Sequence, residues 1–266
     1  MHRDITTSLR GKTIIVTRSA DQQSQARKLF EAKGANILEL PALIIYPPDD
    51  SGPLDEALKE LEDFHWIIFS SSNGVKAVQE RLLFLGSSLS RKPSSLKIAA
   101  VGLKTANYLE HLGIIPDFVP PDFLAESLIK NFPVSGFGLR MLLPRVQTGG
   151  RNVLKDAFIK SGARVVEVPA YETKCPEDIP EKTIIALKNK SADAIVFTSS
   201  KTVSHTALLL NKFLGSKWLT QINELKIISI GPQTSVSCKK YFMRLDQEAD
   251  IHDLDGLVEA CVKSIT

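Results

Sequence analysis

Two stretches of the chain share one hydrophobic pattern. Apolar residues run without interruption over 66–69 (WIIF) and again over 194–197 (AIVF), and three hydroxyl residues follow each run before a helical pattern begins. An apolar run with no polar alternation predicts a strand buried on both faces, as in a parallel sheet covered by helices. The hydroxyl residues are then expected at the carboxyl edge of the sheet, where open α/β folds bind ligands: Ser70, Ser71, Ser72, Thr198, Ser199 and Ser200.

Further strands and helices alternate along the rest of the chain. Short apolar runs predict strands at 13–17, 36–41 and 97–102, with a weaker strand at 117–120. Apolar residues at helical spacing predict helices between them, for example over 21–35, where Asp21 is a possible N-cap and Gly34 ends the pattern. This alternation predicts an α/β fold with parallel sheets.

The second half of the chain repeats the first. GLRMLLPR answers GKTIIVTR with an offset of 127 residues (Arg145 against Arg18), and SGARVVEVPAYET answers KGANILELPALII with an offset of 128 (Pro169 against Pro41). IVFTSS and KIISIGPQT match WIIFSSS and KIAAVGLKT in the same order. We interpret this as a tandem duplication of a βα unit with about five strands, so that each domain forms a flavodoxin-like, five-stranded parallel sheet.

The repeats allow two arrangements: successive domains divided near Pro133, or domains that exchange halves. The least helix-like segments, LIIYPPDDSGP and AYETKCPEDIP, lie at equivalent positions inside each repeat rather than between repeats. This favours a chain that crosses between domains twice. We therefore expect a discontinuous domain 1 (1–43 and 175–266) and an inserted domain 2 (44–174) that includes two crossover segments, at about 44–52 and 170–174.

Composition excludes several classes of protein. The chain has 266 residues, 43% of them hydrophobic, and no apolar run near the ~20 residues of a membrane span, so we expect a soluble protein without membrane contact. Its start has no secretory signal, which predicts a cytoplasmic location, or the plastid stroma if a transit peptide has been removed. A net charge of +3 without a basic, aromatic-rich run argues against nucleic acid. The three cysteines are far apart, which argues against disulfides and a metal site.

Seven segments together resemble the uroporphyrinogen-III synthase family. They are TIIVTR, WIIFSSSNGV, IAAVGLKTA, LLPRVQTGGRNVL, VPAYET, IVFTSS and IISIGPQTS, in this order, from about Gly11 to the C-terminus. No single segment is specific, but their order and spacing are. The resemblance implies two α/β domains joined by a two-stranded crossover linker, in agreement with the exchanged arrangement.

The resemblance also implies a reaction. The family closes linear hydroxymethylbilane to uroporphyrinogen III, with inversion of ring D and loss of water, in haem, chlorophyll and corrin biosynthesis. Such a hydro-lyase needs no cofactor. The implied partners are this small-molecule substrate and, transiently, hydroxymethylbilane synthase as the enzyme that hands it over, with the protein itself a monomer. Because the substrate also closes unaided without inversion, the enzyme mainly selects one geometry.

The candidate site residues are those suited to a ligand with many carboxylates. Tyr171 matches the family's tyrosine that holds or protonates the departing hydroxyl; its alternative role is packing between the domains. Helix N-termini and cations supply anion contacts, with arginine favoured for forked contacts to carboxylates. The candidate substrate-binding residues are Arg18, Ser70, Ser71, Ser72, Gly102, Thr105, Arg145, Gly150, Arg151, Thr198, Ser199, Lys226, Gly231 and Thr234.

Each of these residues also has a structural interpretation. The serines and threonines are suited to cap helices, and Lys226 lies just before its strand, where a solvated charge is equally expected. Two other functional classes share the fold. A two-domain binding protein is normally exported, and no signal is visible; a nucleotide enzyme shows a glycine fingerprint after its first strand, which TIIVTRSADQQ lacks. We also expect hinge motion about the two crossovers.

Overall fold

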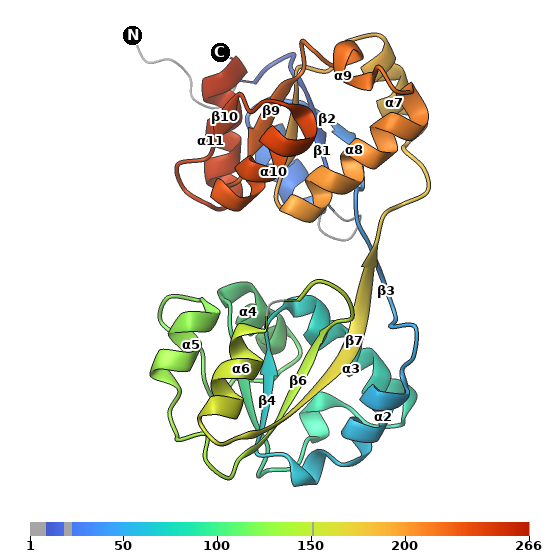
Figure 1. Cartoon of the computed structure of the whole chain (residues 1–266). Coiled ribbons are helices and arrows are strands. Elements are labelled where there is room, and N and C mark those ends of the chain that lie inside the picture. Colours follow the sequence, from blue (N-terminus) through green and yellow to red (C-terminus); the bar gives the residue numbers. More distant parts are fainter. Residues whose placement is uncertain (1–8, 19–22, 151, 266) are drawn as a thin grey trace. The chain divides into compact units, whose positions relative to one another are not determined.

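The computed structural model describes residues 9–18, 23–150 and 152–265. The chain divides into two compact units. Unit 1 comprises Met1–Ile44 and Lys174–Thr266, and unit 2 comprises Ile45–Thr173. Each unit is described by itself below, and Figure 1 labels its elements.

Each unit is built on one five-stranded sheet. Unit 1 contains β1 (Thr13–Val16), α1 (Gln23–Ala32), β2 (Asn36–Glu39), α7 (Glu181–Lys188), β8 (Ala194–Phe197), α8 (Ser200–Leu214), α9 (Trp218–Gln221), β9 (Lys226–Ser229), α10 (Pro232–Phe242), β10 (Gln247–Glu248) and α11 (Leu254–Ile265). The sheet of unit 2 includes β3 (Ile44–Tyr46), whose first residue still belongs to unit 1. With β3 come α2 (Gly52–Lys59), β4 (Trp66–Phe69), α3 (Ser72–Phe84), β5 (Lys97–Ala100), α4 (Leu103–His111), α5 (Ala125–Asn131), β6 (Arg140–Val146), α6 (Val153–Lys160) and β7 (Arg164–Lys174). Single 3-10 turns occupy Leu61–Asp63 and Leu89–Arg91.

The strand order shows how the two repeats are used. The sheet of unit 1 runs β10-β9-β8-β1-β2 and that of unit 2 runs β3-β7-β6-β4-β5. Strands β1 and β2 of the first repeat thus join β8, β9 and β10 of the second, whereas β4 and β5 of the first repeat join β6 and β7 of the second. Strand pairing is parallel among β1, β2, β8, β9 and β10 in unit 1 and among β4, β5, β6 and β7 in unit 2. The predicted class, α/β with two parallel five-stranded sheets, is confirmed, and both sheets are dominated by parallel pairs.

Strand register preserves the duplication. In unit 2 Ile67 pairs with Ile98, and in unit 1 Ile195 pairs with Ile227. These pairs correspond at offsets of 128 (195 minus 67) and 129 (227 minus 98) residues. Equal register in both copies means that the strand ends, and the helices that follow them, are placed equivalently in each unit.

Helices cover both faces of each sheet, which explains why the central strands have no polar alternation. In unit 2, Ile67 and Phe69 of β4 pack with residues of α2, α3 and α4, whereas Trp66 and Ile68 pack with α5 and α6. In unit 1, alternate residues of β8 face α8 and α10 on one side and α1 and α11 on the other (Figure 1). Every residue of β4 and β8 is buried.

One expected strand is nearly lost. The strand expected at 117–120 is reduced to a single bridge between Ala99 and Phe118. The expected strand ends in Pro120, and Pro121 follows it; proline has no N–H to donate to a strand ladder. Among the described residues, no helix is long and apolar enough to cross a membrane.

The buried strand ends predict where substitutions destabilise the protein. Phe69 ends β4 and is 0% exposed, so Phe69→Ala should lower the free energy of unfolding of unit 2 by about 3–5 kcal/mol. Phe137, which is 83% exposed, is the matched control, and Phe137→Ala should change it by less than about 0.5 kcal/mol. Urea unfolding followed by fluorescence and circular dichroism measures both. Equal effects would contradict the placement of the core.

Candidate functional site

A pocket of about 320 Å³ lies at the carboxyl edge of the sheet in unit 2. Its walls come from the ends of β4, β5, β6 and β7 and from the starts of α5 and α6. The lining residues are Ile68, Ser70, Val101, Phe123, Leu124, Ala125, Leu143, Arg145, Val146, Gly150, Val153, Leu154 and Tyr171. Mostly apolar walls with a few convergent polar groups are typical of sites for organic ligands.

Tyr171 brings a phenol to this pocket from β7. Its side chain is largely buried, with the residue 8% exposed, and its hydroxyl lies 2.9 Å from the Ser71 hydroxyl. Burial raises the pKa of Tyr171 above its ordinary value. The hydrogen bond to Ser71 and the positive charge of Arg145 lower this pKa but do not outweigh burial. The phenol is therefore protonated at neutral pH and can donate a hydrogen bond or a proton.

Ser71 has a second role at the start of α3. Its backbone is extended and its hydroxyl accepts a hydrogen bond from the Gly74 N–H at 3.2 Å, which is an N-cap. Ser199 caps α8 in the same way, accepting from the Thr202 N–H at 3.2 Å. The structural interpretation of these two serines is therefore correct, and Ser71 in addition contacts Tyr171.

Arg145 forms the charged part of the pocket wall. Its guanidinium donates to a carboxylate oxygen of Glu167 and, at 3.2 Å, to the side-chain oxygen of Asn152. The Arg145 side chain is 12% exposed. Gly150 lies against it: a Cβ on Gly150 would be 2.1 Å from Nη2 of Arg145, so any other residue would displace the guanidinium.

The other candidates in unit 2 occupy the same edge with different exposure. Ser70 lines the pocket, and Ser72 is the first residue of α3. Gly102 is the extended N-cap residue of α4. Thr105, in the first turn of α4, is only 3% exposed, which fits a packing role better than a contact with a ligand. Arg151 lies outside the described residues.

Unit 1 brings a second group of candidates to the carboxyl edge of its own sheet. Arg18 follows β1, Thr198 and Ser199 follow β8, and Gly231 precedes α10. The Ser200 hydroxyl donates to the Gln233 carbonyl at 2.9 Å, which ties the starts of α8 and α10 together. Thr234 is 5% exposed, so it is about as buried as its counterpart Thr105 in unit 2.

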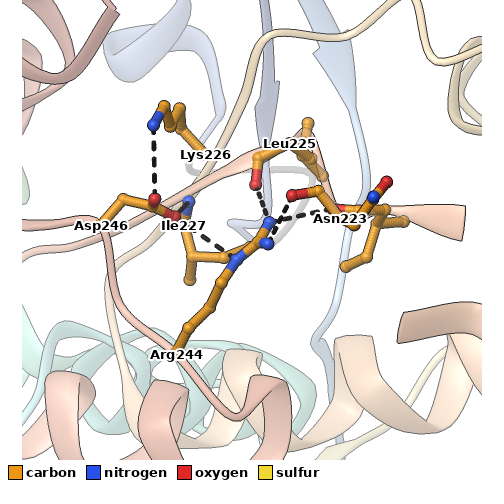
Figure 2. A network of polar contacts seen from close by, with 7 residues as sticks. Asn223, Leu225, Lys226, Ile227, Arg244 and Asp246 are labelled. Atoms are coloured by element: carbon orange, nitrogen blue, oxygen red, sulfur yellow. Dashed lines mark hydrogen bonds and ion pairs between the residues drawn. The ribbon is translucent and has the colours of Figure 1, made fainter. Parts of the chain in front are cut away.

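Lys226 does not join this group. It is the first residue of β9, so it lies at the amino edge of the sheet, opposite the other candidates of unit 1. Its ammonium is 3.5 Å from the Asp246 carboxylate, whose other oxygen accepts from the Ile227 N–H at 2.8 Å. Figure 2 shows this network, in which Arg244 also approaches Asp246. The expectation of a solvated edge charge describes Lys226 better than substrate binding.

Sequence reasoning missed two kinds of residue. Phe123, with a left-handed φ of 53°, and its neighbour Leu124 line the pocket although both are large, exposed apolar side chains in a loop. No hydrophobic periodicity marks such residues. Glu167 was also missed. It lies on β7, next to the edge strand of its sheet, where a charged residue is interpreted from the sequence alone as exposed to solvent. The first repeat has a glutamate, Glu39, at the equivalent position, so a comparison of the two repeats does not single out Glu167.

Comparison with known proteins is consistent with the fold. The family model described as uroporphyrinogen-III synthase HemD matches residues 24–259. A uroporphyrinogen-III synthase of Synechococcus elongatus is 46% identical over 250 residues, 94% of each chain. A putative uroporphyrinogen-III synthase of Methanothermobacter thermautotrophicus is 27% identical and covers 82% of this chain and 85% of its own. In fold, the chain is similar to a mutant uroporphyrinogen III synthase of Thermus thermophilus, with a TM-score of 0.60, 17% identity, and 95% and 98% of the two chains covered.

The environment of Tyr171 predicts its titration. A difference titration between the wild type and Tyr171→Phe, followed by near-ultraviolet absorbance, isolates the phenolate of Tyr171. The midpoint of its formation should lie above the ordinary tyrosine value of 10.0. Ser71→Ala should raise this pKa further, because it removes a hydrogen bond that stabilises the phenolate.

Ser199→Ala is the control, since it removes an equivalent helix cap without touching a tyrosine in the described contacts. Either cap substitution should cost about 1 kcal/mol of stability. A Tyr171 that ionises below pH 10.0, or an equal shift in Ser199→Ala, would show that the pocket environment is not as described.

Proposed function

The chain belongs to the uroporphyrinogen-III synthase family, and on that premise we propose how its residues act. The protein is a cyclising lyase of tetrapyrrole biosynthesis. Its substrate is hydroxymethylbilane, which it closes to uroporphyrinogen III with loss of water and inversion of the last ring. The pocket of unit 2 supplies the proton donor and a cation for the substrate's carboxylates.

The observation that carries this assignment is a protonated, largely buried phenol beside a guanidinium in an apolar pocket. Loss of the substrate's hydroxyl is easier when a hydrogen-bond donor stabilises the charge that develops on the leaving oxygen. Tyr171 supplies that donor when the Ser71 hydroxyl donates to the phenol oxygen, because the O–H of the phenol is then free for the substrate. Arg145 offers a forked contact for an acetate or propionate group, so the substrate is oriented while the hydroxyl leaves.

The size of the pocket limits what it binds. At about 320 Å³ it lies at the lower end of the ~300–1,000 Å³ typical of small-molecule sites. It therefore holds part of a tetrapyrrole rather than the whole. The candidates of unit 1, Arg18, Thr198, Ser199 and Gly231, are proposed as carboxylate contacts at the edge of their own sheet.

The proposed activity is tested with freshly prepared hydroxymethylbilane. We expect the enzyme to yield mainly the inverted isomer, resolved as oxidised porphyrins by chromatography, whereas the blank without enzyme yields the uninverted isomer. An isomer ratio equal to that of the blank would reject the proposed function.

Replacing the phenol tests the role of Tyr171. Tyr171→Phe should lower kcat about ten-fold, less than the ~10²–10⁴ of an essential acid, because the hydroxyl also leaves without help. Tyr108→Phe is the control, since Tyr108 packs against the core of unit 2 and does not line the pocket. Stopped reactions analysed for bilane consumption and isomer ratio measure both. A kcat of Tyr171→Phe equal to that of Tyr108→Phe would remove Tyr171 from the mechanism.

A further inference from the structure

One glutamate has a different partner in each copy of the repeat. Glu39 ends β2 in unit 1, and its counterpart in β7 of unit 2 is Glu167, at an offset of 128 (167 minus 39). In unit 1, Glu39 accepts from Arg27 of α1 at 2.6 Å. The counterpart of Arg27 is Lys155, whose ammonium is 3.7 Å from Glu167.

Glu167 instead makes its hydrogen-bonded ion pair with Arg145 at the pocket. The Glu167 side chain is 26% exposed and that of Arg145 is 12% exposed, so the pair is partly withdrawn from water. A charge pair in this position is screened less than a surface pair. The glutamate that ties a strand to a helix in unit 1 thus holds a pocket arginine in unit 2.

The geometry of Arg145 depends on this contact. Glu167 and Asn152 hold its guanidinium from two elements, and Gly150 leaves the space that Nη2 occupies. Without such contacts, a long arginine side chain samples many rotamers, and ordering it on ligand binding costs free energy. The contact also has an electrostatic consequence. The carboxylate of Glu167 offsets part of the positive charge of Arg145, which weakens the attraction between Arg145 and a carboxylate of the substrate.

We propose that Glu167 is a positioning residue for Arg145, which it aims at the pocket and whose attraction for substrate carboxylates it moderates. This inference rests on the proposed function, because it takes the ligand of Arg145 to be a carboxylate of the tetrapyrrole. Glu167 itself is not a catalytic residue. Its effect on substrate is transmitted through the guanidinium.

Substitution by glutamine separates charge from geometry. Glu167→Gln keeps the size and one acceptor oxygen but removes the negative charge, so it should lower KM for hydroxymethylbilane about five-fold, the order expected for one charge near a partly exposed carboxylate. The salt dependence of KM should become steeper. Glu39→Gln, the same change at the equivalent position of unit 1, should leave KM unchanged, because its partner Arg27 does not line the pocket.

A double-mutant cycle tests whether Glu167 acts through Arg145. In the background of Arg145→Met, Glu167→Gln should have no effect on KM, because the group through which it acts is gone. Gly150→Ala should raise KM by displacing the guanidinium while leaving Glu167 in place. Thermal unfolding of each variant separates loss of folding from these effects.

Three results would overturn the inference: an equal change of KM in Glu167→Gln and Glu39→Gln, no change in either, or an undiminished effect of Glu167→Gln when Arg145 is absent. These outcomes are distinct from failure of the proposed function. That failure appears in the isomer ratio of the wild type, whereas the role of Glu167 appears only in the KM of variants that still form the inverted isomer.

Discussion

Burial of the central strands on both faces is the constraint from which the rest of the structure follows. Strands β4 and β8 have no exposed residue, so these two central strands offer no polar group along their length. Their polar neighbours lie just beyond the strand ends, where the chain turns into a helix and backbone N–H groups lack intrahelical partners. The pocket of unit 2 lies at such an edge, between strand ends and the starts of α5 and α6. Both the pocket and the hydroxyl residues at this edge are consequences of how the core is covered.

Much of the fold could be predicted because it depends on local pattern and on repetition. The apolar runs at 66–69 and 194–197 and the nearly constant offset of the two repeats are properties of the sequence, and the structure repeats them in strand register. The site was less predictable. Phe123 enters the pocket through a loop with a left-handed backbone, and Lys226, a candidate for substrate binding, lies at the amino edge of its sheet. Loop paths and strand ends are decided by tertiary contacts, which no periodicity records.

Duplication supplies an internal reference for separating structural from functional residues. Paired features present in both copies answer requirements of the fold. Asp117 and Asp246, for example, each accept from the N–H of the second residue of a strand, Ile98 and Ile227, at 2.8 Å. Their offset is 129 residues (246 minus 117), so this contact has been kept in both units. A backbone N–H at the start of the strand needs an acceptor in both units, which explains the contact without any ligand.

Features present in one copy need another explanation. Ser71 and Ser199 cap their helices with the same geometry, so the cap alone accounts for a serine at both positions. Tyr171, however, corresponds to Leu43 of the first repeat, 128 residues earlier (171 minus 43), so the contact between Ser71 and a phenol exists in unit 2 alone. A leucine satisfies packing at such a position more cheaply than a buried hydroxyl, which must keep a hydrogen-bond partner. A role for the O–H of Tyr171 in the pocket accounts for a tyrosine at this position, and the asymmetry of the two copies supports the proposal that the proton donor lies in unit 2.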